Sequence, residues 1–234
     1  DKLERSLLVG SIVDINTILD DPESPLVDIL RQGSGDGIDL VSGGPPCQSF
    51  SMAGLRQHDN TRNTLPMDFA KLTGIVRPKI ALLENVSGIL RAFSLPSGKH
   101  YAWFEVAKAF VSQGYYPLCL HVNAKFVGAA QNRPRFIMLA IREDIFNTFK
   151  ENVSDETILT KIKKIEAFFH LERNGKKTRP FEHLDYYDIQ KHSDLFETNI
   201  FSPLNQYKDP DSWFSVKDAI DDLRINNSKK TNTR

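Results

Sequence analysis

Up to about residue 142 the chain alternates between short apolar runs and longer segments with helical periodicity. The short runs are bounded by Gly, Pro or charged residues, a pattern typical of β-strands; they cover residues 37–44, 78–85, 116–124 and 135–143. Residues 64–77 and 100–115 carry apolar side chains at helical spacing. Because strands that alternate with helices need crossover connections, the pattern predicts an α/β fold with a mainly parallel, Rossmann-like sheet that helices cover on both faces.

The ends of these predicted elements carry their own signals. Thr64 can cap the start of the first helix, and Arg77, which precedes a proline, can end it. Gly114 closes the second helix, as a C-terminal glycine commonly does. No helical segment separates residues 116–126 from 133–143, so we expect these two strands to form an antiparallel hairpin that closes the sheet.

Beyond residue 150 the pattern changes. Residues 155–184 are typical of a charged amphipathic helix followed by a loop rich in Gly, Lys and Arg, and residues 213–225 of one more short helix. We therefore divide the chain into a core over residues 1–150 and a helical, irregular extension over residues 151–234.

The tetrapeptide Glu-Asn-Val-Ser occurs at residues 84–87 and again at 151–154, in two different settings. No strand precedes the second copy and acids follow it, so Asn152 or Ser154 is predicted to cap the start of a helix. The first copy follows an apolar strand, which places Glu84 at the carboxyl end of that strand, where open α/β sheets bind ligands. A half-buried carboxylate there can act as an acid near neutral pH, although strand ends also carry carboxylates for solubility alone.

Composition narrows the class of protein. With 40% hydrophobic and 26% charged residues, the chain resembles soluble globular proteins. No apolar run approaches the ~20 residues that span a bilayer, and the opening decapeptide is too short and acidic for a signal peptide, so we expect a cytoplasmic protein. The 2 cysteines give no disulfide framework and the 6 histidines no metal-ligand spacing, so no metal is expected. The 30 basic and 30 acidic residues balance, which argues neither for nor against nucleic acid.

A cysteine follows the first predicted strand, in the sequence Gly-Gly-Pro-Pro-Cys-Gln-Ser-Phe-Ser at residues 43–51. Pro45 and Pro46 stiffen the backbone and hold Cys47 at the same edge of the sheet as the first Glu-Asn-Val-Ser copy. A thiolate is a strong nucleophile, so Cys47 is a candidate for covalent catalysis, with a small buried hydrophobe as the alternative. Cys119 lies inside an apolar run and is predicted to be a core residue without chemistry.

A third polar element, Gln-Asn-Arg-Pro-Arg at residues 131–135, leads into the last predicted strand. Arg133 and Arg135 alternate along an extended backbone, so both can project toward one face. Their guanidinium groups could hold an anion or a carboxylate there. Ordinary surface charge is the alternative for both residues.

The cysteine motif, Glu-Asn-Val and Gln-Asn-Arg-Pro-Arg occur in this order along the chain, and Arg-Asn-Thr-Leu at residues 62–65 lies between the first two. In these motifs and their order, the chain resembles the C5-cytosine DNA methyltransferases. The resemblance covers residues from about 9 to 142, and residues 214–223 resemble the segment that precedes that family's target-recognition region. It implies a class I methyltransferase fold, S-adenosyl-L-methionine as the methyl donor, double-stranded DNA as the substrate and a bacterial restriction–modification system. Gln-Ser-Phe-Ser after the cysteine is closer to the DNA-directed enzymes than to the tRNA-directed branch.

The resemblance also implies a mechanism. Cys47 attacks C6 of cytosine, which gives C5 carbanion character, and Glu84 stabilises the developing charge through N3. C5 then takes the methyl group, loses its proton and expels the thiolate, and the base has to be flipped out of the duplex for this. Arg133, Arg135 and Gln131 would hold the base and Glu84 in place.

Substrate and cofactor residues follow from the same motifs. We expect the substrate to contact residues of the cysteine motif, its following loop and Glu-Asn-Val, namely Pro45, Ser51, Arg56, Asn85 and Val86. The cofactor pocket is expected to include Ser11, Ile12, Pro46 and Leu65. Residues 7–15 resemble the family's third motif, but Ser11 stands where an acidic residue that contacts adenine is usual.

Two features of the family are missing from the sequence. Residues 33–37, the Gly-rich candidate for a cofactor turn, precede a strand instead of opening a helix. The target-recognition region and the closing motifs are also absent, so the chain resembles a middle piece, and a second chain could supply what is missing. Two alternatives stay open: a catalytically incomplete half or non-enzymatic partner of a split methyltransferase, and a tRNA cytosine-C5 methyltransferase. A degenerate partner would not need Cys47, Glu84 and Arg135 together, and this chain has all three.

Overall fold

The computed structural model of the chain has a mixed α/β fold. It describes residues 9–21, 23–26, 28, 37–46, 64–96, 98–188, 191–198, 211, 213 and 215–220. Within these residues, one sheet has five strands in the order β1-β2-β6-β5-β7. The strands are β1 (Leu40–Gly43), β2 (Ile80–Val86), β5 (Tyr115–Asn123), β6 (Pro134–Arg142) and β7 (Tyr186–Asp188).

The strand directions agree with the predicted sheet. β1 pairs with β2 in parallel, and β5 pairs with β7 in parallel. β6 is antiparallel to both of its neighbours, β2 and β5. β6 therefore runs against the other strands of the described sheet, which confirms a mainly parallel sheet closed by an antiparallel β5–β6 hairpin.

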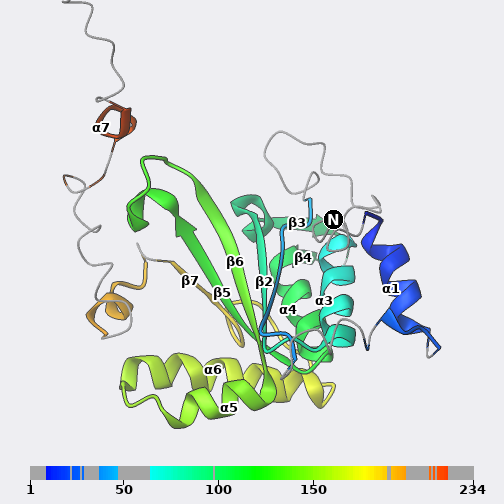
Figure 1. The fold of residues 1–234 in the computed structure, drawn as a ribbon. Helices are drawn as coiled ribbons and strands as arrows, with labels where there is room; N and C mark the ends of the chain where they lie inside the picture. Colours follow the sequence, from blue (N-terminus) through cyan, green and yellow to red (C-terminus); the bar gives the residue numbers. More distant parts are fainter. Residues whose placement is uncertain are drawn as a thin grey trace, which may run out of the picture.

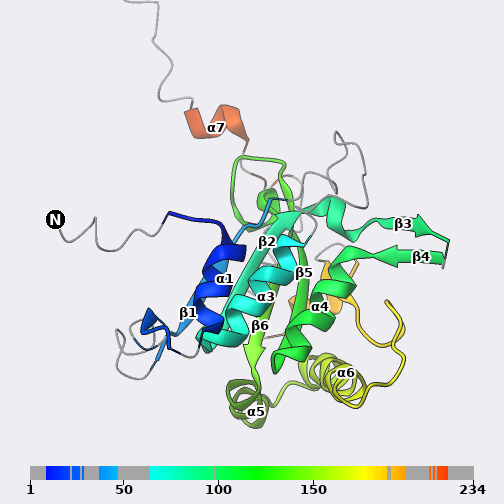
Figure 2. The ribbon, with the colours of Figure 1, turned by 90° about the vertical axis from the view of Figure 1, so that its right-hand side faces the viewer.

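Helices flank this sheet. The helices α1 (Ile12–Asp20), α3 (Leu65–Val76) and α4 (Ala102–Ser112) lie side by side over one face (Figure 2). The helices α5 (Glu143–Glu151) and α6 (Glu156–Arg173) lie at the lower end of the sheet in Figure 1 and pack on the start of β5 and its partner strand β6. None of the helices in the described ranges has the length and apolar character of a membrane span.

The two ends of the sheet differ in the elements that surround them. The site edge consists of the carboxyl ends of β1 and β2 with the start of β6, residues 43–46, 84–86 and 134–135. The opposite end consists of the start of β5, residues 115–116, with α5 and α6. Strand β6 joins the two regions, because its start pairs with β2 at the site edge and its end pairs with β5 at the opposite end.

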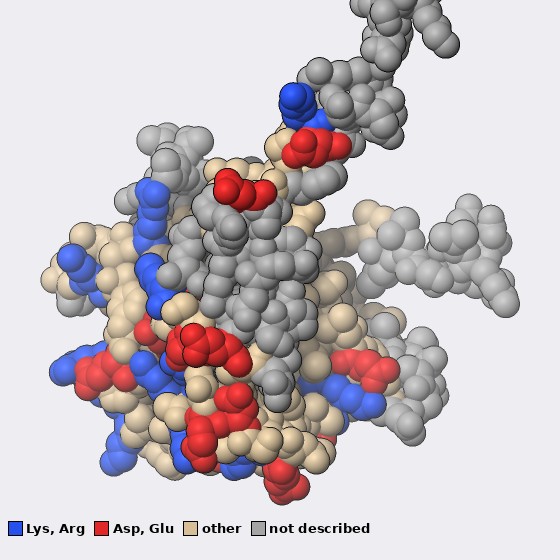
Figure 3. Space-filling model, turned by 90° about the vertical axis from the view of Figure 1, so that its left-hand side faces the viewer, with Lys and Arg blue, Asp and Glu red and all other residues tan. Residues whose placement is uncertain are grey.

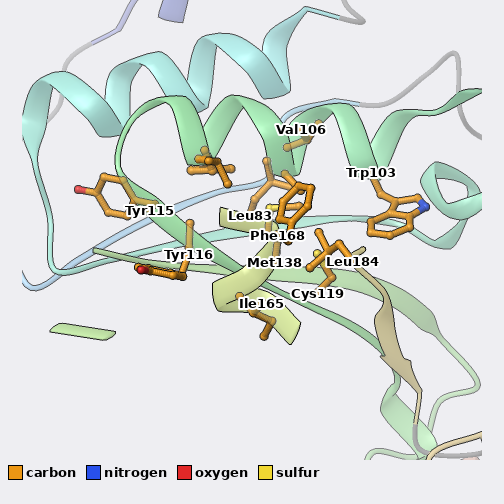
Figure 4. Packing of buried hydrophobic residues seen from close by; sticks show 14 of the residues in the cluster. Leu83, Trp103, Val106, Tyr115, Tyr116, Cys119, Met138, Ile165, Phe168 and Leu184 are labelled. Carbon is orange, nitrogen blue, oxygen red and sulfur yellow. The ribbon is translucent and has the colours of Figure 1, made fainter. Parts of the chain in front are cut away.

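The core between the sheet and α4 follows from the alternation of side chains along a strand. In β2, Leu83 and Asn85 are buried, whereas the residues between and beside them are half-buried on the other face. Figure 4 shows Leu83 and Met138 of β6 beneath α4, which carries Trp103 and Val106. All four of these apolar side chains are buried, so α4 is fixed to the sheet along its inner face.

Tyr115 and Tyr116 leave the start of β5 on opposite faces, because neighbouring strand residues alternate. The Tyr115 hydroxyl donates to the carbonyl oxygen of Pro78 at 2.7 Å. The Tyr116 ring is stacked between Phe146 of α5 and Phe169 of α6, with ring centroids 4.0 and 3.9 Å away. Burial raises the pKa of both tyrosine hydroxyls to about 12. The opposite end is thus built around a three-ring stack.

The residues after 150 pack onto the same core. Ile162, Ile165 and Phe168 of α6 are buried in the cluster that contains the sheet residues, and the Phe168 ring lies 5.4 Å from that of Phe104 in α4. The helix over residues 156–173 confirms the predicted amphipathic helix. The residues on the two sides of the predicted boundary at residue 150 therefore share one hydrophobic core. The boundary itself stays a prediction.

Charged side chains of both signs intermingle toward the lower part of the molecule on the face shown in Figure 3. Helix α6 takes part in two ion pairs: Glu166 Oε1 lies 2.5 Å from Lys150 Nζ, and Lys161 Nζ lies 3.2 Å from Asp194 Oδ2.

Two predicted helix caps are wrong in detail. Thr64 precedes α3, but its side chain makes no capping hydrogen bond. Helix α6 is capped by Asp155, whose Oδ1 accepts the N–H groups of Thr157 and Ile158 at 2.9 and 3.1 Å. The second Glu-Asn-Val-Ser copy instead ends α5, where Asn152 is the C-cap. Helix α5 continues to residue 151, so the tetrapeptide lies at the end of one helix and does not begin the next. Asp155 directly precedes α6, and its carboxylate is therefore the group that caps the N–H groups of the first turn.

Arg77 ends α3 as predicted, in the left-handed conformation with φ 58°. The predicted helix over residues 213–225 is confirmed in part by α7 (Val216–Ile220). Several elements were not predicted: helix α5, strand β7, the hairpin of β3 (Ala92–Leu95) and β4 (Gly98–Tyr101), and the 3₁₀ turns η3 (Ser87–Leu90), η4 (Ala124–Val127) and η5 (Ser193–Glu197). All are short, and short elements give weak periodic patterns.

Candidate active site

The two glycines that follow β1 are explained by two different close approaches. A Cβ atom at Gly43 would lie 2.7 Å from the ring of Phe69 in α3, so a side chain there would push α3 away from the strand. A Cβ atom at Gly44 would lie 3.4 Å from Oε2 of Glu84. The backbone that leads to Pro45 therefore passes directly beside the carboxylate at the end of β2.

Glu84 and Arg135 form an ion pair across the site edge. Arg135 Nε lies 2.6 Å from Glu84 Oε1, and the pairing of Val86 with Arg135 in the β2–β6 ladder brings the two side chains to the same face. Arg135 Nη1 also donates to the carbonyl oxygen of Pro134 at 2.8 Å, which fixes the guanidinium against its own strand.

The two oxygens of the Glu84 carboxylate have different surroundings. Oε1 contacts Arg135, whereas Oε2 lies on the side of Gly44. The Glu84 side chain is 43% exposed, so it can meet a ligand from solvent. The arrangement offers a carboxylate that is held by one oxygen and is accessible at the site edge.

Asn85, the next residue along β2, points to the buried face and is 2% exposed. Its Nδ2 donates to the carbonyl oxygen of Pro45 at 3.2 Å, and its Oδ1 accepts the N–H of Val86 at 2.8 Å. Asn85 thus ties the end of β2 to the diproline, 40 positions earlier in the sequence. The sequence predicts a substrate contact for Asn85, whereas its described contacts are with backbone.

Three predicted site residues, Cys47, Ser51 and Arg56, lie outside the described residues. Pro45 is half-buried, Pro46 is exposed, and both lie at the site edge directly before Cys47 in the sequence. Of the predicted catalytic residues, the structure therefore brings together Glu84 and Arg135, and it places them beside the diproline that leads to the cysteine.

Gln131 and Arg133 are exposed in the connection between η4 and β6. The backbone N–H of Arg133 donates to Oδ1 of Asn123 at 3.0 Å, and the N–H of Gln131 donates to the carbonyl oxygen of Ala129 at 2.7 Å. Within the described residues, neither side chain contacts Glu84. Their predicted supporting role stays a prediction.

Sequence reasoning missed Asn123, which organises this connection. Its Oδ1 accepts the N–H groups of Lys125 and Arg133, and its Nδ2 donates to Oδ1 of Asn132 at 2.8 Å. The available signal was an Asn at the end of a strand, because Asn side chains commonly bond to nearby backbone in turns. Asn123 therefore fixes the start of β6, which carries Arg135.

The residues predicted to hold the cofactor lie near the site edge. Figures 1 and 2 place the N-terminal ends of α1 and α3 there. Ser11 is the N-cap of α1, and its Oγ accepts the N–H of Val13 at 3.3 Å. Ile12 and Leu65 are the first residues of α1 and α3 and are half-buried. In α3, Pro66 has no N–H, and the N–H groups of Met67 and Asp68 donate to the carbonyl oxygen of Thr64. The two apolar side chains, beside the first turn of α1, could hold part of a flat ligand with polar edges.

Cys119 is a poor nucleophile by comparison. Its thiol is fully buried in β5, and burial raises the pKa of the thiol far above its usual range. This confirms its place in the core. Among the described residues, no group of His, Cys, Asp and Glu side chains is arranged to hold a metal ion.

The chain is similar to known proteins of one family. The model of the C-5 cytosine-specific DNA methylase family matches residues 14–233. The type II methyltransferase M1.HphI of Haemophilus parahaemolyticus is 35% identical over 141 residues, which is 59% of this chain and 35% of the relative. The type II methyltransferase M.DdeI of Desulfomicrobium norvegicum is 34% identical over 107 residues, 46% of this chain and 25% of the relative. The chain thus spans about a third or less of the length of these relatives.

Two solved structures are also similar. A DNA modification methyltransferase encoded within an E. coli prophage has 30% identity and a TM-score of 0.38, and the match covers 56% of this chain and 35% of that one. The Dnmt2 methyltransferase of S. pombe has 18% identity and a TM-score of 0.33, with 62% of this chain and 53% of that one covered.

Proposed function

Because the chain belongs to the C-5 cytosine-specific DNA methylase family, we propose that it forms the catalytic core of a DNA cytosine-C5 methyltransferase from a restriction–modification system. The observation that carries the proposal is the Glu84–Arg135 ion pair, which lies at the same edge of the sheet as the diproline before Cys47. The chain spans only part of its relatives, so the activity is proposed for the natural full-length protein.

In the proposed reaction, the Cys47 thiolate forms a bond to C6 of a cytosine that has been flipped out of the duplex. The electron pair displaced from the ring then resides on C5, and Glu84, protonated or sharing a proton with the base, stabilises it through a hydrogen bond donated to N3. After methylation, C5 loses its proton to water, the bond between C6 and the Cys47 sulfur breaks, and the thiolate is regenerated. S-adenosyl-L-methionine supplies the methyl group when it is bound.

The surroundings of Glu84 suit this role. Arg135 occupies Oε1 at 2.6 Å, which leaves Oε2 as the oxygen that can face the base. An ion pair that holds one oxygen fixes the direction of the other, and fixed groups contribute more to a transition state than mobile ones. Arg133 and Gln131 are exposed at the same edge and would meet the base or the DNA backbone, together with Ser51, Arg56, Pro45 and Val86.

Ile12, Leu65, Pro46 and Ser11 would line the cofactor pocket. The half-buried apolar side chains fit the adenine ring, and backbone N–H groups in the first turn of α1 can bond its polar edge. Ser11 already uses its oxygen to cap α1, so it contributes a weaker polar partner than the acidic residue usual at that position.

Covalent trapping tests the function. The full-length protein, given S-adenosyl-L-methionine and DNA with 5-fluorocytosine at the target, should form a stable covalent complex, because fluorine at C5 cannot leave as a proton does. Cys47→Ser should abolish the complex, and Cys119→Ser should leave it unchanged because that thiol is buried. A complex that persists in Cys47→Ser, or that is lost in Cys119→Ser instead, would contradict the assignment.

A second candidate is a chain that cannot bind the cofactor by itself and acts as one half of a split enzyme. Ser11, which stands where an acidic residue is usual in the family, favours it. A charged hydrogen bond is worth about 1.5–3 kcal/mol, so the loss of this one would weaken cofactor binding about tenfold to a hundredfold. Calorimetric titration of residues 1–234 with S-adenosyl-L-methionine decides: micromolar binding would exclude this candidate.

A further inference from the structure

We propose that Asn85 is a positioning residue for Cys47, which acts by holding the carbonyl group of Pro45 and does not touch the substrate. The inference rests on the proposed function for its catalytic consequence, but the contact itself does not depend on it. Asn85 Nδ2 donates to the Pro45 carbonyl oxygen at 3.2 Å, and the side chain is 2% exposed.

The burial of Asn85 argues against a substrate contact. Side chains alternate along β2, so Glu84 and Val86 face the open side and Asn85 faces the covered side, next to buried Leu83. A buried amide is costly unless its polar atoms are bonded, and both ends of this one are bonded to backbone. Its hydrogen-bonding capacity is therefore directed into the protein.

The diproline explains why a side chain is needed at this point. The parallel pairing of β1 with β2 ends at Gly43 opposite Leu83. Beyond it, Pro45 and Pro46 have no N–H groups, so they cannot donate the hydrogen bonds that would continue the ladder. The Pro45 carbonyl is still an acceptor, and the Asn85 amide reaches it from the neighbouring strand. The hydrogen bond from the Asn85 side chain thus takes the place of the next backbone hydrogen bond between β1 and β2.

The side-chain amide of Asn85 is also oriented toward the Pro45 carbonyl group. The N–H of Val86 donates to Asn85 Oδ1 at 2.8 Å, which directs Nδ2 toward Pro45. Because Glu84 and Asn85 are adjacent, the end of one strand fixes the proposed acid on one face and the diproline before the proposed nucleophile on the other. Loss of the Asn85 bond should free the diproline without changing Glu84 or Arg135.

Alkylation of Cys47 tests the contact without cofactor or DNA. In Asn85→Ala and Asn85→Asp, which both lack the donor, we expect the rate of Cys47 alkylation by iodoacetamide to change about threefold or more, because the reactivity of a thiol depends on its surroundings. Asn16→Ala is the matched control, because Asn16 is also 2% exposed and its Nδ2 donates to a backbone oxygen, that of Asp68, at 2.9 Å. Cys119 should stay unmodified in every folded variant.

The catalytic consequence is measured in the full-length protein. Asn85→Ala should slow covalent trapping by 5-fluorocytosine DNA about ten- to hundredfold, because small misplacements of reacting groups cost that much, and should leave the Kd for DNA unchanged. Equal alkylation rates in Asn85→Ala and the unmodified protein would overturn the proposal, as would a loss of DNA affinity with an unchanged trapping rate. If the unmodified protein forms no covalent complex, the proposed function fails, and the alkylation rate still decides the role of Asn85.

Discussion

The opposite end and the site edge of the sheet are held together by different kinds of contact. At the opposite end, Tyr116 is stacked between Phe146 and Phe169 at 4.0 and 3.9 Å. At the site edge, single polar contacts hold the structure: the Glu84–Arg135 ion pair at 2.6 Å and the bond from Asn85 to Pro45 at 3.2 Å. The strands β2, β5 and β6 therefore receive their stability at one end and present polar groups at the other.

The magnitudes of these contacts differ accordingly. Removal of a buried aromatic ring costs about 3–5 kcal/mol, whereas a half-exposed ion pair contributes about 1 kcal/mol or less to stability. Substitutions at the opposite end should therefore change the free energy of unfolding, and substitutions at the site edge should change the chemistry. Single substitutions at each end test whether effects on stability and effects on chemistry are separated in this way.

Phe146→Ala should have the largest effect on stability. Phe146 is buried and stacks on Tyr116, so we expect the free energy of unfolding in urea to fall by about 3–5 kcal/mol. Phe149→Ala on the same helix is the matched control, because Phe149 is 42% exposed and its loss should cost about 0.5 kcal/mol. Equal effects of the two substitutions would mean that the stack does not stabilise the opposite end.

Glu84→Gln should have a large effect on the reaction rate and a small effect on stability. The single-turnover rate of methyl transfer in the full-length protein should fall about a hundredfold, because the proposed interaction strengthens as charge develops on the ring. The free energy of unfolding should change by about 1 kcal/mol or less, as for a half-exposed ion pair. Glu105→Gln, which removes a carboxylate 3.4 Å from Lys108 on α4, is the control and should affect neither quantity strongly. DNA affinity that falls while the rate holds would refute the role of Glu84.

The elements with long apolar patterns were predictable from the sequence, and those made by tertiary contacts were not. The runs that became β2, β5 and β6 combine several buried side chains each, so their pattern is strong. Strand β7 has only three residues, and its pairing with β5 is accompanied by a contact of 2.6 Å between His121 Nδ1 and Asp188 Oδ2, 67 positions apart. No local pattern encodes such a contact.

The candidate site shows the same limit. The contact of Arg135 with Glu84 was expected from the resemblance to the C5-cytosine DNA methyltransferases, and the structure shows it. The role of Asn85 could not be predicted, because the sequence does not tell which neighbour's backbone a buried amide reaches. The reason for Gly43 and Gly44 also emerges only from the positions of Phe69 and Glu84 in space.

Asp144→Asn should produce a smaller, pH-dependent loss of stability at the opposite end. Arg142 donates to both carboxylate oxygens of Asp144, at 2.6 and 2.8 Å, and this hydrogen bonding lowers the pKa of Asp144 to about 2. A lowered pKa means that the stabilisation is present above the ordinary value near 3.8 and is lost as the pH falls toward about 2. Because Asp144 is 59% exposed, solvent screening limits the effect to about 1 kcal/mol.

Urea unfolding at several pH values measures this loss. The difference between Asp144→Asn and the unmodified protein should be constant from pH 7 down to about pH 4 and should shrink below it. Asp39→Asn serves as the control, because the Asp39 side chain, which pairs with Lys79 at 2.7 Å, is 80% exposed. A difference that grows as the pH falls would have the wrong sign for this explanation.

Lys125→Leu should have the smallest effect and should be local to the tip of the β5–β6 hairpin. Lys125 Nζ lies 3.7 Å from the ring centroid of Trp213, and the Phe126 ring lies 5.2 Å from the same tryptophan. A cation over an aromatic ring at a partly exposed site contributes about 0.5 kcal/mol, so the free energy of unfolding should hardly change. The segment around Trp213, which leads to α7, should instead become more accessible to solvent.

Acrylamide quenching can detect this change, because the chain has 2 tryptophans and the other one, Trp103, is fully buried in the core. Quenching of the folded protein therefore reports on Trp213, and it should increase in Lys125→Leu. Lys108→Leu is the matched control, since Lys108 Nζ lies 5.9 Å from the ring centroid of Phe104, away from Trp213. If both variants are quenched as the unmodified protein is, Lys125 does not anchor this segment, and the ring of Phe126 has to hold Trp213 at the hairpin tip by itself.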